Sequence, residues 1–338
     1  MKSPKVTVLM SVYNGEMYLR EAIDSILNQT FTDFEFLIVN DGSTDGTAEI
    51  LQSYDDPRIK IVNNEQNIGL TKSLNKGLGM AKGEYIARMD ADDVSMPERL
   101  EKEVTSLDQN RNVGLVGTHY LMINENGKEL HTIKGWTESG KLTEKLLEGN
   151  PFGHGSVMFS AECIEKVGLY REEFKFAQDY DFWLRISDVC DVANISELLY
   201  KWRFNSKSIS VTRKNQQDKY SLLAIELAKE RRQFGKDRLQ TSEREGIDAL
   251  LEDSLLKSKA LSRKETAQSY YFWGVILLGG NDYRGALKLL LQSFINNPLY
   301  KSTWVLILED LVLLLLPKPM VNTLRFVKLH LAPKGIDK

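Results

Sequence analysis

Short apolar runs alternate with segments of helical period in the first part of the chain. Each run has the length and composition of a buried strand, and the runs occupy residues 6–10, 34–39, 59–62 and 85–89. Two segments between them, 18–27 and 70–80, carry apolar side chains at helical spacing. Strands that alternate with helices predict an α/β fold, in which a mostly parallel sheet is covered by helices on both faces.

Polar residues follow three of these expected strands. They are Ser11-Val12-Tyr13-Asn14 after the first strand, Asn40-Asp41 after the second and Asp90-Ala91-Asp92 after the fourth. The carboxyl ends of parallel strands lie at one edge of a sheet, which is where open α/β sheets bind ligands. We therefore expect these polar groups to converge on one site.

The stretch Tyr85–Asp93 runs from an apolar strand directly into three carboxylates. Two carboxylates with one residue between them offer hard oxygen ligands to Mg²⁺ or Mn²⁺. Alternatively, the acids only precede a helix, because Ser95 and Glu98 have the spacing of a capping box, with Pro97 in the first turn. That alternative leaves the acids themselves without a role, so the stretch favours a metal or phosphate site.

Overall composition indicates a protein of two domains with no main role in binding nucleic acid. The chain has 338 residues and a net charge of −3, from 44 Lys and Arg against 47 Asp and Glu. Its two cysteines, Cys163 and Cys190, lack metal-ligand spacing, and no signal peptide or apolar run of membrane-spanning length is visible. A cytoplasmic protein is therefore expected, either free or lying on the inner face of the membrane.

A change in composition near Thr212 predicts a boundary between domains at 1–212 and 213–338. The second part is helical in period, and Gly280–Pro298 resembles one tetratricopeptide-like hairpin. The segment Trp304–Leu331 is apolar with basic residues nearby, which is typical of a helix on a membrane surface but also of an ordinary packed helix. The two readings carry equal weight.

Further candidate residues lie in loops and at helix starts. Asp179 and Asp181 fall in the first turn of an expected helix, where the helix dipole alone would favour acids. His154 lies in a Gly-flanked loop that would line a substrate or phosphate pocket, although a lone histidine is more often structural. Lys72 opens the third helix, where it would contact phosphate or remain solvated, and Arg203 is expected to close over the site.

Five segments resemble, in the same order, motifs of the family-2 inverting glycosyltransferases of the GT-A fold, and the resemblance covers roughly residues 4–210. The segments are Val6–Asn14, Val39–Thr47, Asn67–Leu70, Ala81–Tyr85 and Asp90–Asp93. The resemblance implies a GT-A nucleotide-sugar-binding fold. It also implies a metal-dependent hexosyltransferase that moves one sugar from a nucleotide-sugar donor to an acceptor hydroxyl, with inversion at the anomeric carbon.

The resemblance also implies roles for individual residues. Tyr13 and Asp41 would hold the base, usually uracil, Asp90 the ribose or the metal, and Asp92 the Mn²⁺ or Mg²⁺ that bridges the diphosphate. Asp179 would be the general base, preceded here by Gln178 where the family often has Glu. The remaining donor-site candidates are Ser11, Asn14, Lys72, Ala91 and His154.

The chain has no Gln-x-x-Arg-Trp signature of processive synthases, which favours transfer of a single sugar to a glycan or lipid-linked acceptor in bacterial cell-surface polysaccharide or glycolipid synthesis. Two other functions are compatible with a nucleotide-binding α/β sheet. A sugar-phosphate nucleotidyltransferase would need a Gly-rich, basic first loop, which Ser11–Gly15 is not. A non-catalytic scaffold would not need Asp41, Asp90, Asp92 and Asp179 intact. The sequence leaves open the sugar, the acceptor, the linkage and the oligomeric state.

Overall fold

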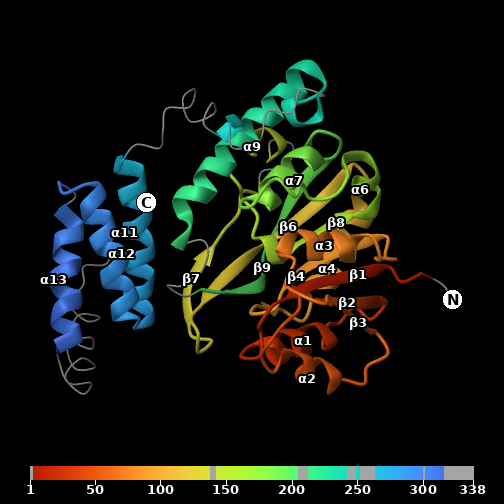
Figure 1. The fold of residues 1–338 in the computed structure, drawn as a ribbon, viewed down its shortest axis with the longest axis horizontal. Coiled ribbons are helices and arrows are strands. Elements are labelled where there is room, and N and C mark those ends of the chain that lie inside the picture. The colour runs from red at the N-terminus through yellow and green to blue at the C-terminus, as the bar shows by residue number, and fades with distance from the viewer. Residues whose placement is uncertain are drawn as a thin grey trace. The chain divides into compact units, whose positions relative to one another are not determined.

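Four parallel strands begin the fold, as the alternation of strands and helices predicts (Figure 1). They are β1 (Val6–Val12), β2 (Phe34–Asn40), β3 (Ile59–Asn63) and β4 (Tyr85–Asp90). The computed structural model describes residues 3–137, 142–204, 212–241, 249–251, 263–299 and 301–315. Most residues of these strands are apolar, many of them β-branched or aromatic, and β1 and β2 are buried along their whole length.

The sheet continues beyond β4 with strands from the middle of the chain, in the order β3-β2-β1-β4-β8-β6-β9-β5 with β7 beside β6. Strand β8 (Val157–Ser160) runs antiparallel to both β4 and β6 (Val113–Ile123). Strand β9 (Asp191–Arg203) is parallel to β6, and β7 (Glu129–Ile133) is antiparallel to it. Mixed strand directions thus follow the parallel half.

Helices cover both faces of this sheet, because alternate residues of each strand point to opposite sides. Val6, Val8 and Met10 of β1 join one buried cluster with α1 and α4, whereas Leu9 joins another with α3, α7 and α9. The helices are α1 (Leu19–Leu27), α2 (Thr47–Gln52), α3 (Leu70–Leu78), α4 (Arg99–Gln109), α5 (Leu142–Lys145), α6 (Ala161–Val167), α7 (Gln178–Ser187) and α9 (Lys214–Phe234). The 3₁₀ turns are η1 (His154–Ser156) and η2 (Arg238–Gln240).

The helix start predicted at Ser95 is wrong. Ser95 lies in the short strand β5 (Val94–Ser95), and its Oγ accepts a hydrogen bond of 3.1 Å from Gln29 Nε2. Helix α4 begins at Arg99 without a side-chain cap. Pairing with β9 satisfies the backbone of this stretch, so the local capping pattern is not used.

The chain divides into two compact units, one of Met1–Phe204 and Ser208–Ser258, the other of Asn205–Lys207 and Lys259–Lys338. The first unit therefore continues past the predicted boundary at 212, because the apolar side of α9 joins the buried cluster of α7. The second unit contains α11 (Arg263–Gly280), α12 (Tyr283–Asn296) and α13 (Lys301–Leu315). Among the described helices, none is both long enough and apolar enough to cross a membrane.

Candidate active site

The ends of β1, β2 and β4 meet at one edge of the sheet, as the sequence predicted. Strand register places Ser11 between Asp90 of β4 and Val39 of β2. Asn14 follows with a positive φ of 52°, and its Oδ1 accepts a hydrogen bond of 2.8 Å from the backbone N–H of Thr44. The loops after β1 and β2 are thereby joined into one polar rim.

Asp41 is buried at this rim and shapes it. Its Oδ1 accepts a hydrogen bond of 2.9 Å from the backbone N–H of Ile68, and its Oδ2 accepts one of the same length from Gly69. Gly69 has a φ of 93°, a conformation that side chains disfavour. Asp41 therefore folds the loop before α3 against β2, while Tyr13 on the neighbouring loop stays half exposed and open to a ligand.

Buried cations lie beneath the acidic turn. Arg88, fully buried, donates from Nη2 to Asp90 Oδ1 at 2.6 Å. Burial opposes ionisation of Asp90, but the charge and hydrogen bond of Arg88, together with His154 and Arg99, outweigh it and hold the pKa of Asp90 below its ordinary value. Arg99, also fully buried, donates from Nη2 to the carbonyl oxygen of Arg88 at 2.8 Å. Two buried arginines, Arg88 and Arg99, thus contact the end of β4 that carries Asp90.

The other two acids differ from each other. Part of the Asp92 side chain is exposed to solvent. Neighbouring groups nevertheless reduce the hydration of its carboxylate, and this desolvation, together with the charge of Asp90, raises its pKa to about 6. Asp93 is buried, and its Oδ1 accepts a hydrogen bond of 2.7 Å from the backbone N–H of Arg203. Arg203 does not close over the site as expected. It is buried and donates from Nε to the carbonyl oxygen of Asp92 at 2.7 Å, which fixes the turn.

Gly155 lies so close to Asp90 that no side chain fits. A Cβ at this position would lie 2.0 Å from Tyr200 Oη and 2.9 Å from Asp90 Oδ2. Tyr200 Oη in turn accepts a hydrogen bond of 3.2 Å from the backbone N–H of Asp90. The preceding His154 has its Nε2 at 3.2 Å from Tyr170 Oη, and burial together with the charge of Arg88 lowers its pKa to about 3. His154 is therefore neutral at pH 7.

Asp179 stands in the first turn of α7, two residues after a strained residue. Ala177, at the start of the helix, has a φ of 51° in the left-handed region that non-glycine residues rarely adopt. Burial raises the pKa of Asp179 to about 6, although backbone N–H groups and Asn150 Nδ2, at 3.3 Å, favour its charged form. Asp181 in the same turn is instead fully buried in an ion pair with Arg185 at 2.9 Å.

A cavity of about 570 Å³ brings four of the predicted residues together, namely Lys72, Asp90, His154 and Asp179. Lys72 is exposed at the edge of this cavity, and its Nζ lies 3.9 Å from Glu172 Oε2. The remaining candidates lie outside the lining residues of this cavity but on the strand ends and loops beside it, namely Ser11, Tyr13, Asn14, Asp41, Ala91 and Asp92.

Much of the cavity wall comes from residues that the sequence did not single out. They are mostly aromatic and belong to β6, β9 and the loops before η1 and α7, namely Tyr120, Phe152, Phe174, Phe176, Tyr200 and Trp202. Gln217 of α9 completes it. No local pattern marks these positions, because the sheet order that gathers them depends on pairings between distant strands.

The chemistry of the acidic pair suits a hard divalent cation. Asp92 carries a carboxylate beside that of Asp90, and after desolvation the charge of Asp90 is the next cause of its raised pKa, a repulsion that a cation would relieve. Within the residues that the structure describes, no group of three or more His, Cys, Asp or Glu residues is arranged to hold a metal on its own. Asp90 and Asp92 would thus supply part of a coordination shell, as is common for Mg²⁺ held by one or two carboxylates and substrate phosphates.

Comparison with known proteins identifies similar chains. The profile described as "Glycosyl transferase family 2" matches residues 7–164. The O-antigen biosynthesis glycosyltransferase WbnJ of Escherichia coli is 40% identical over 210 residues, which cover 60% of this chain and 81% of WbnJ. An uncharacterized glycosyltransferase of Haemophilus influenzae is 35% identical over 226 residues, covering 64% of this chain and 70% of that protein.

Two solved structures share the fold. S. aureus TarS 1-349 in complex with UDP-GlcNAc superposes with a TM-score of 0.57 at 19% identity, covering 90% of this chain and 89% of that one. The mannosyltransferase PcManGT from Pyrobaculum calidifontis, in complex with GDP-Man and Mn²⁺, gives a TM-score of 0.53 at 18% identity, covering 92% of this chain and 85% of that one. The α/β architecture is therefore the GT-A fold.

Proposed function

Because the chain belongs to glycosyltransferase family 2, and is a glycosyltransferase, we propose that it transfers one sugar from a UDP-linked donor to an acceptor hydroxyl with inversion. The observation that carries this proposal is the cavity, which has Asp90 and Asp179 in its lining together with the aromatic residues. An acidic donor site and a candidate base are therefore both within reach of one substrate.

On the donor side, Tyr13 and Asp41 hold the base in this proposal, with Ser11, Asn14 and Ala91 beside them. The exposed Tyr13 ring supports a stacking role, and Asp41 acts by ordering the loop before α3. Asp92 and Asp90 would hold a divalent cation, Mn²⁺ or Mg²⁺, whose charge offsets that of the departing diphosphate. Lys72 lines the same cavity as Asp90, and in this proposal it contacts the same phosphates.

Asp179 is the general base of the proposed reaction. It takes the proton of the acceptor hydroxyl as that oxygen attacks the anomeric carbon. A carboxylate with an ordinary pKa is a weak base, whereas one with a pKa near 6 is better matched to proton transfer at neutral pH. Neutral His154 lines the same cavity and is available as a hydrogen-bond partner for the sugar.

The acceptor in this proposal carries its hydroxyl on a sugar, either in a glycan or in a lipid-linked saccharide. Tyr120 and Trp202, whose ring centroids are 6.2 Å apart, lie in the cavity lining with Phe152 and Phe176. Aromatic faces suit the C–H face of a pyranose, while Gln217 and Lys175 offer polar contacts to its hydroxyls. An acceptor of this kind fits bacterial cell-surface polysaccharide or glycolipid synthesis.

Peripheral contact with the cytoplasmic membrane face is a further part of the proposal. On α13, Trp304, Val305 and Leu308 are 47%, 57% and 60% exposed. The sequence that follows contributes the basic residues Lys318, Arg325, Lys328 and Lys334, which lie outside the described residues. Apolar burial and attraction of basic residues to anionic lipid would act together.

A panel of UDP-, GDP- and dTDP-sugars, each with and without Mn²⁺, tests the donor assignment by thermal shift. Ligands that bind the folded state raise its melting temperature. We expect the largest rise with a UDP-sugar and Mn²⁺, release of UDP in the presence of saccharide acceptors, and inverted anomeric configuration of the product by NMR. A donor of another nucleotide class, a metal-independent rise or a retained configuration would contradict the corresponding part of the proposal.

A further inference from the structure

An ion pair closes the base of the loop that carries Asp179. Arg171 Nη1 donates to Asp181 Oδ1 at 3.3 Å, and between these two residues the chain forms the cavity wall of Glu172, Phe174–Gln178 and Asp179. Asp181 is fully buried, and the Arg171 side chain is 13% exposed. The loop is therefore held at both ends by one contact, two residues away from the candidate base.

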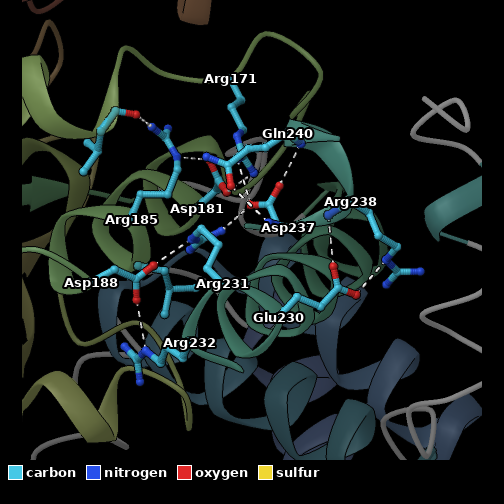
Figure 2. A network of polar contacts seen from close by, with 12 residues as sticks. Arg171, Asp181, Arg185, Asp188, Glu230, Arg231, Arg232, Asp237, Arg238 and Gln240 are labelled. Carbon is cyan, nitrogen blue, oxygen red and sulfur yellow. Dashed lines mark hydrogen bonds and ion pairs between the residues drawn. The ribbon is translucent and has the colours of Figure 1, made fainter. Parts of the chain in front are cut away.

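A second contact joins this loop to the region after α9. Arg171 Nη2 donates to Asp237 Oδ2 at 2.8 Å, and Arg231 Nη1 donates to the same oxygen at 2.6 Å. Asp237 is also buried and caps η2 through Gln240, whose backbone N–H donates to Asp237 Oδ1 at 3.1 Å (Figure 2). We call Arg171, Asp181 and Asp237 the clasp.

Each carboxylate of the clasp has a second arginine. Asp181 Oδ2 accepts from Arg185 Nε at 2.9 Å, and Asp237 accepts from Arg231, which also bonds Asp188. Arg171 is thus the member that links the two halves of the network (Figure 2). Aromatic packing supports the same connection, because Phe174 of the loop lies 5.7 Å from Tyr220 of α9, centroid to centroid.

Buried ion pairs often contribute little to stability, because desolvation offsets their attraction, and some are retained because they select one conformation. Here the selected conformation includes the strained backbone of Ala177, which persists only if its surroundings hold it. The clasp anchors the chain six residues before Ala177 and four residues after it. Together with the packing of Phe174 on Tyr220 and the hydrogen bond of 3.1 Å from the backbone N–H of Asp181 to the carbonyl oxygen of Ala177, these contacts hold the strained segment in place.

We propose that Arg171 and Asp237 are positioning residues that hold the loop of residues 172–179, and with it the carboxylate of Asp179, in the geometry needed for transfer. The inference rests on the proposed role of Asp179 as the base. In this proposal, α9 and η2 contribute to catalysis by positioning Asp179, although both lie beyond the matched family region of residues 7–164.

Arg171→Gln is the best test, because it breaks the link while Asp181 keeps Arg185 and Asp237 keeps Arg231. We expect kcat for sugar transfer to fall about tenfold or more, since small misplacement of a reacting group is costly, with the donor KM within about twofold of wild type. The acid limb of the kcat–pH profile should move to lower pH, because a less enclosed Asp179 has a lower pKa. Asp237→Asn should act in the same direction, and Asp237→Glu should recover part of the loss.

Glu230→Gln is the matched control. Glu230 pairs with Arg238 Nε at 2.7 Å, between the same α9 and η2 but outside the clasp, so kcat and the pH profile should stay at wild-type values. Hydrogen exchange supplies a readout that does not depend on the reaction. Amides of residues 172–179 should exchange about tenfold faster in Arg171→Gln, with those of β1 unchanged.

Unchanged exchange of residues 172–179 in folded Arg171→Gln would overturn the proposal. So would a lower melting temperature with unchanged kcat and pH profile, because that result assigns the clasp to stability alone. If wild-type protein transfers no sugar from any nucleotide donor, the proposed function fails, and the exchange measurement still decides whether the clasp holds the loop. If Asp237→Asn fails to fold, Arg171→Gln and its exchange rates carry the decision.

Discussion

Replacing Asp179 by asparagine is expected to stabilise the protein while removing most of its activity. Burial raises the pKa of this carboxyl from 3.8 to about 6. At 1.36 kcal/mol for each pKa unit, the ionised group makes the folded state about 3 kcal/mol less favourable at neutral pH. Solvent reaches part of the side chain, and the charge gains something from its place in the first turn of α7. We therefore expect a net gain of about 1–2 kcal/mol for Asp179→Asn.

The gain should depend on pH with a definite sign. A carboxyl with a raised pKa in the folded state binds protons more tightly there than in the unfolded chain, so its penalty is absent at low pH. The advantage of Asp179→Asn should be near zero at about pH 4, grow between pH 4 and 6, and remain constant above about pH 7. Turnover should fall by roughly 10²-fold or more, the usual scale for loss of a general base, with donor binding nearly intact.

Asp181→Asn is the matched control, because it changes the same residue type in the same helical turn. Asp181 is fully buried between Arg171 and Arg185, and removal of one partner of a buried pair typically costs about 3–5 kcal/mol. Protection of β1 and β4 amides against hydrogen exchange measures the stability of the first unit in both variants. If Asp179→Asn is less stable than wild type at pH 7.5, or its gain is the same at pH 4 and pH 7.5, the argument from burial is refuted.

Three further predictions follow from the donor site and the C-terminal helices. Asp92→Asn should lower the affinity for Mn²⁺ with UDP at least tenfold in isothermal titration, and equal affinity would remove Asp92 from the metal site. Gly155→Ala should destabilise the chain by about 1–3 kcal/mol, because its methyl group would meet Tyr200 Oη, and Tyr200→Phe in the same chain should restore part of the loss. The double variant Val305→Gln and Leu308→Gln should sediment less with anionic phosphatidylglycerol vesicles. It should remain folded, since both side chains are exposed. If the wild-type protein does not bind such vesicles at low salt, membrane contact is refuted.

The parallel half of the fold was predictable because its signals are local. Each strand from β1 to β4 is a short apolar run, and the polar residues after β1, β2 and β4 meet at the edge that parallel pairing requires. The capping pattern at Ser95 failed because a strand more than a hundred residues later pairs with it. Arg203 was misplaced for the same reason, since its partners lie on the acidic turn and on α1.

Spacing alone could not separate Asp179 from Asp181, because both lie in the first turn of α7. The difference comes from Arg171 and Arg185, which neutralise Asp181, while Asp179 opens into the cavity. Family resemblance indicated Asp179, and the structure adds the physical reason why the two acids are not equivalent. The contacts of Asp41 were likewise not predictable from the sequence, because the Asn40-Asp41 pattern does not indicate its hydrogen bonds to the loop before α3.

The two halves of the site differ in what holds them in place. Backbone pairing between β1, β2 and β4 fixes the proposed donor side, so its residues stand at strand ends that a local sequence pattern marks. Side-chain packing among α7, α9 and the 172–179 loop forms the part of the proposed acceptor side that lies beyond the matched region of residues 7–164. In the proposed function, substitutions at the cavity-lining Trp202 or Gln217 should therefore change which acceptor is bound without altering the strand register that presents Asp90 and Asp92.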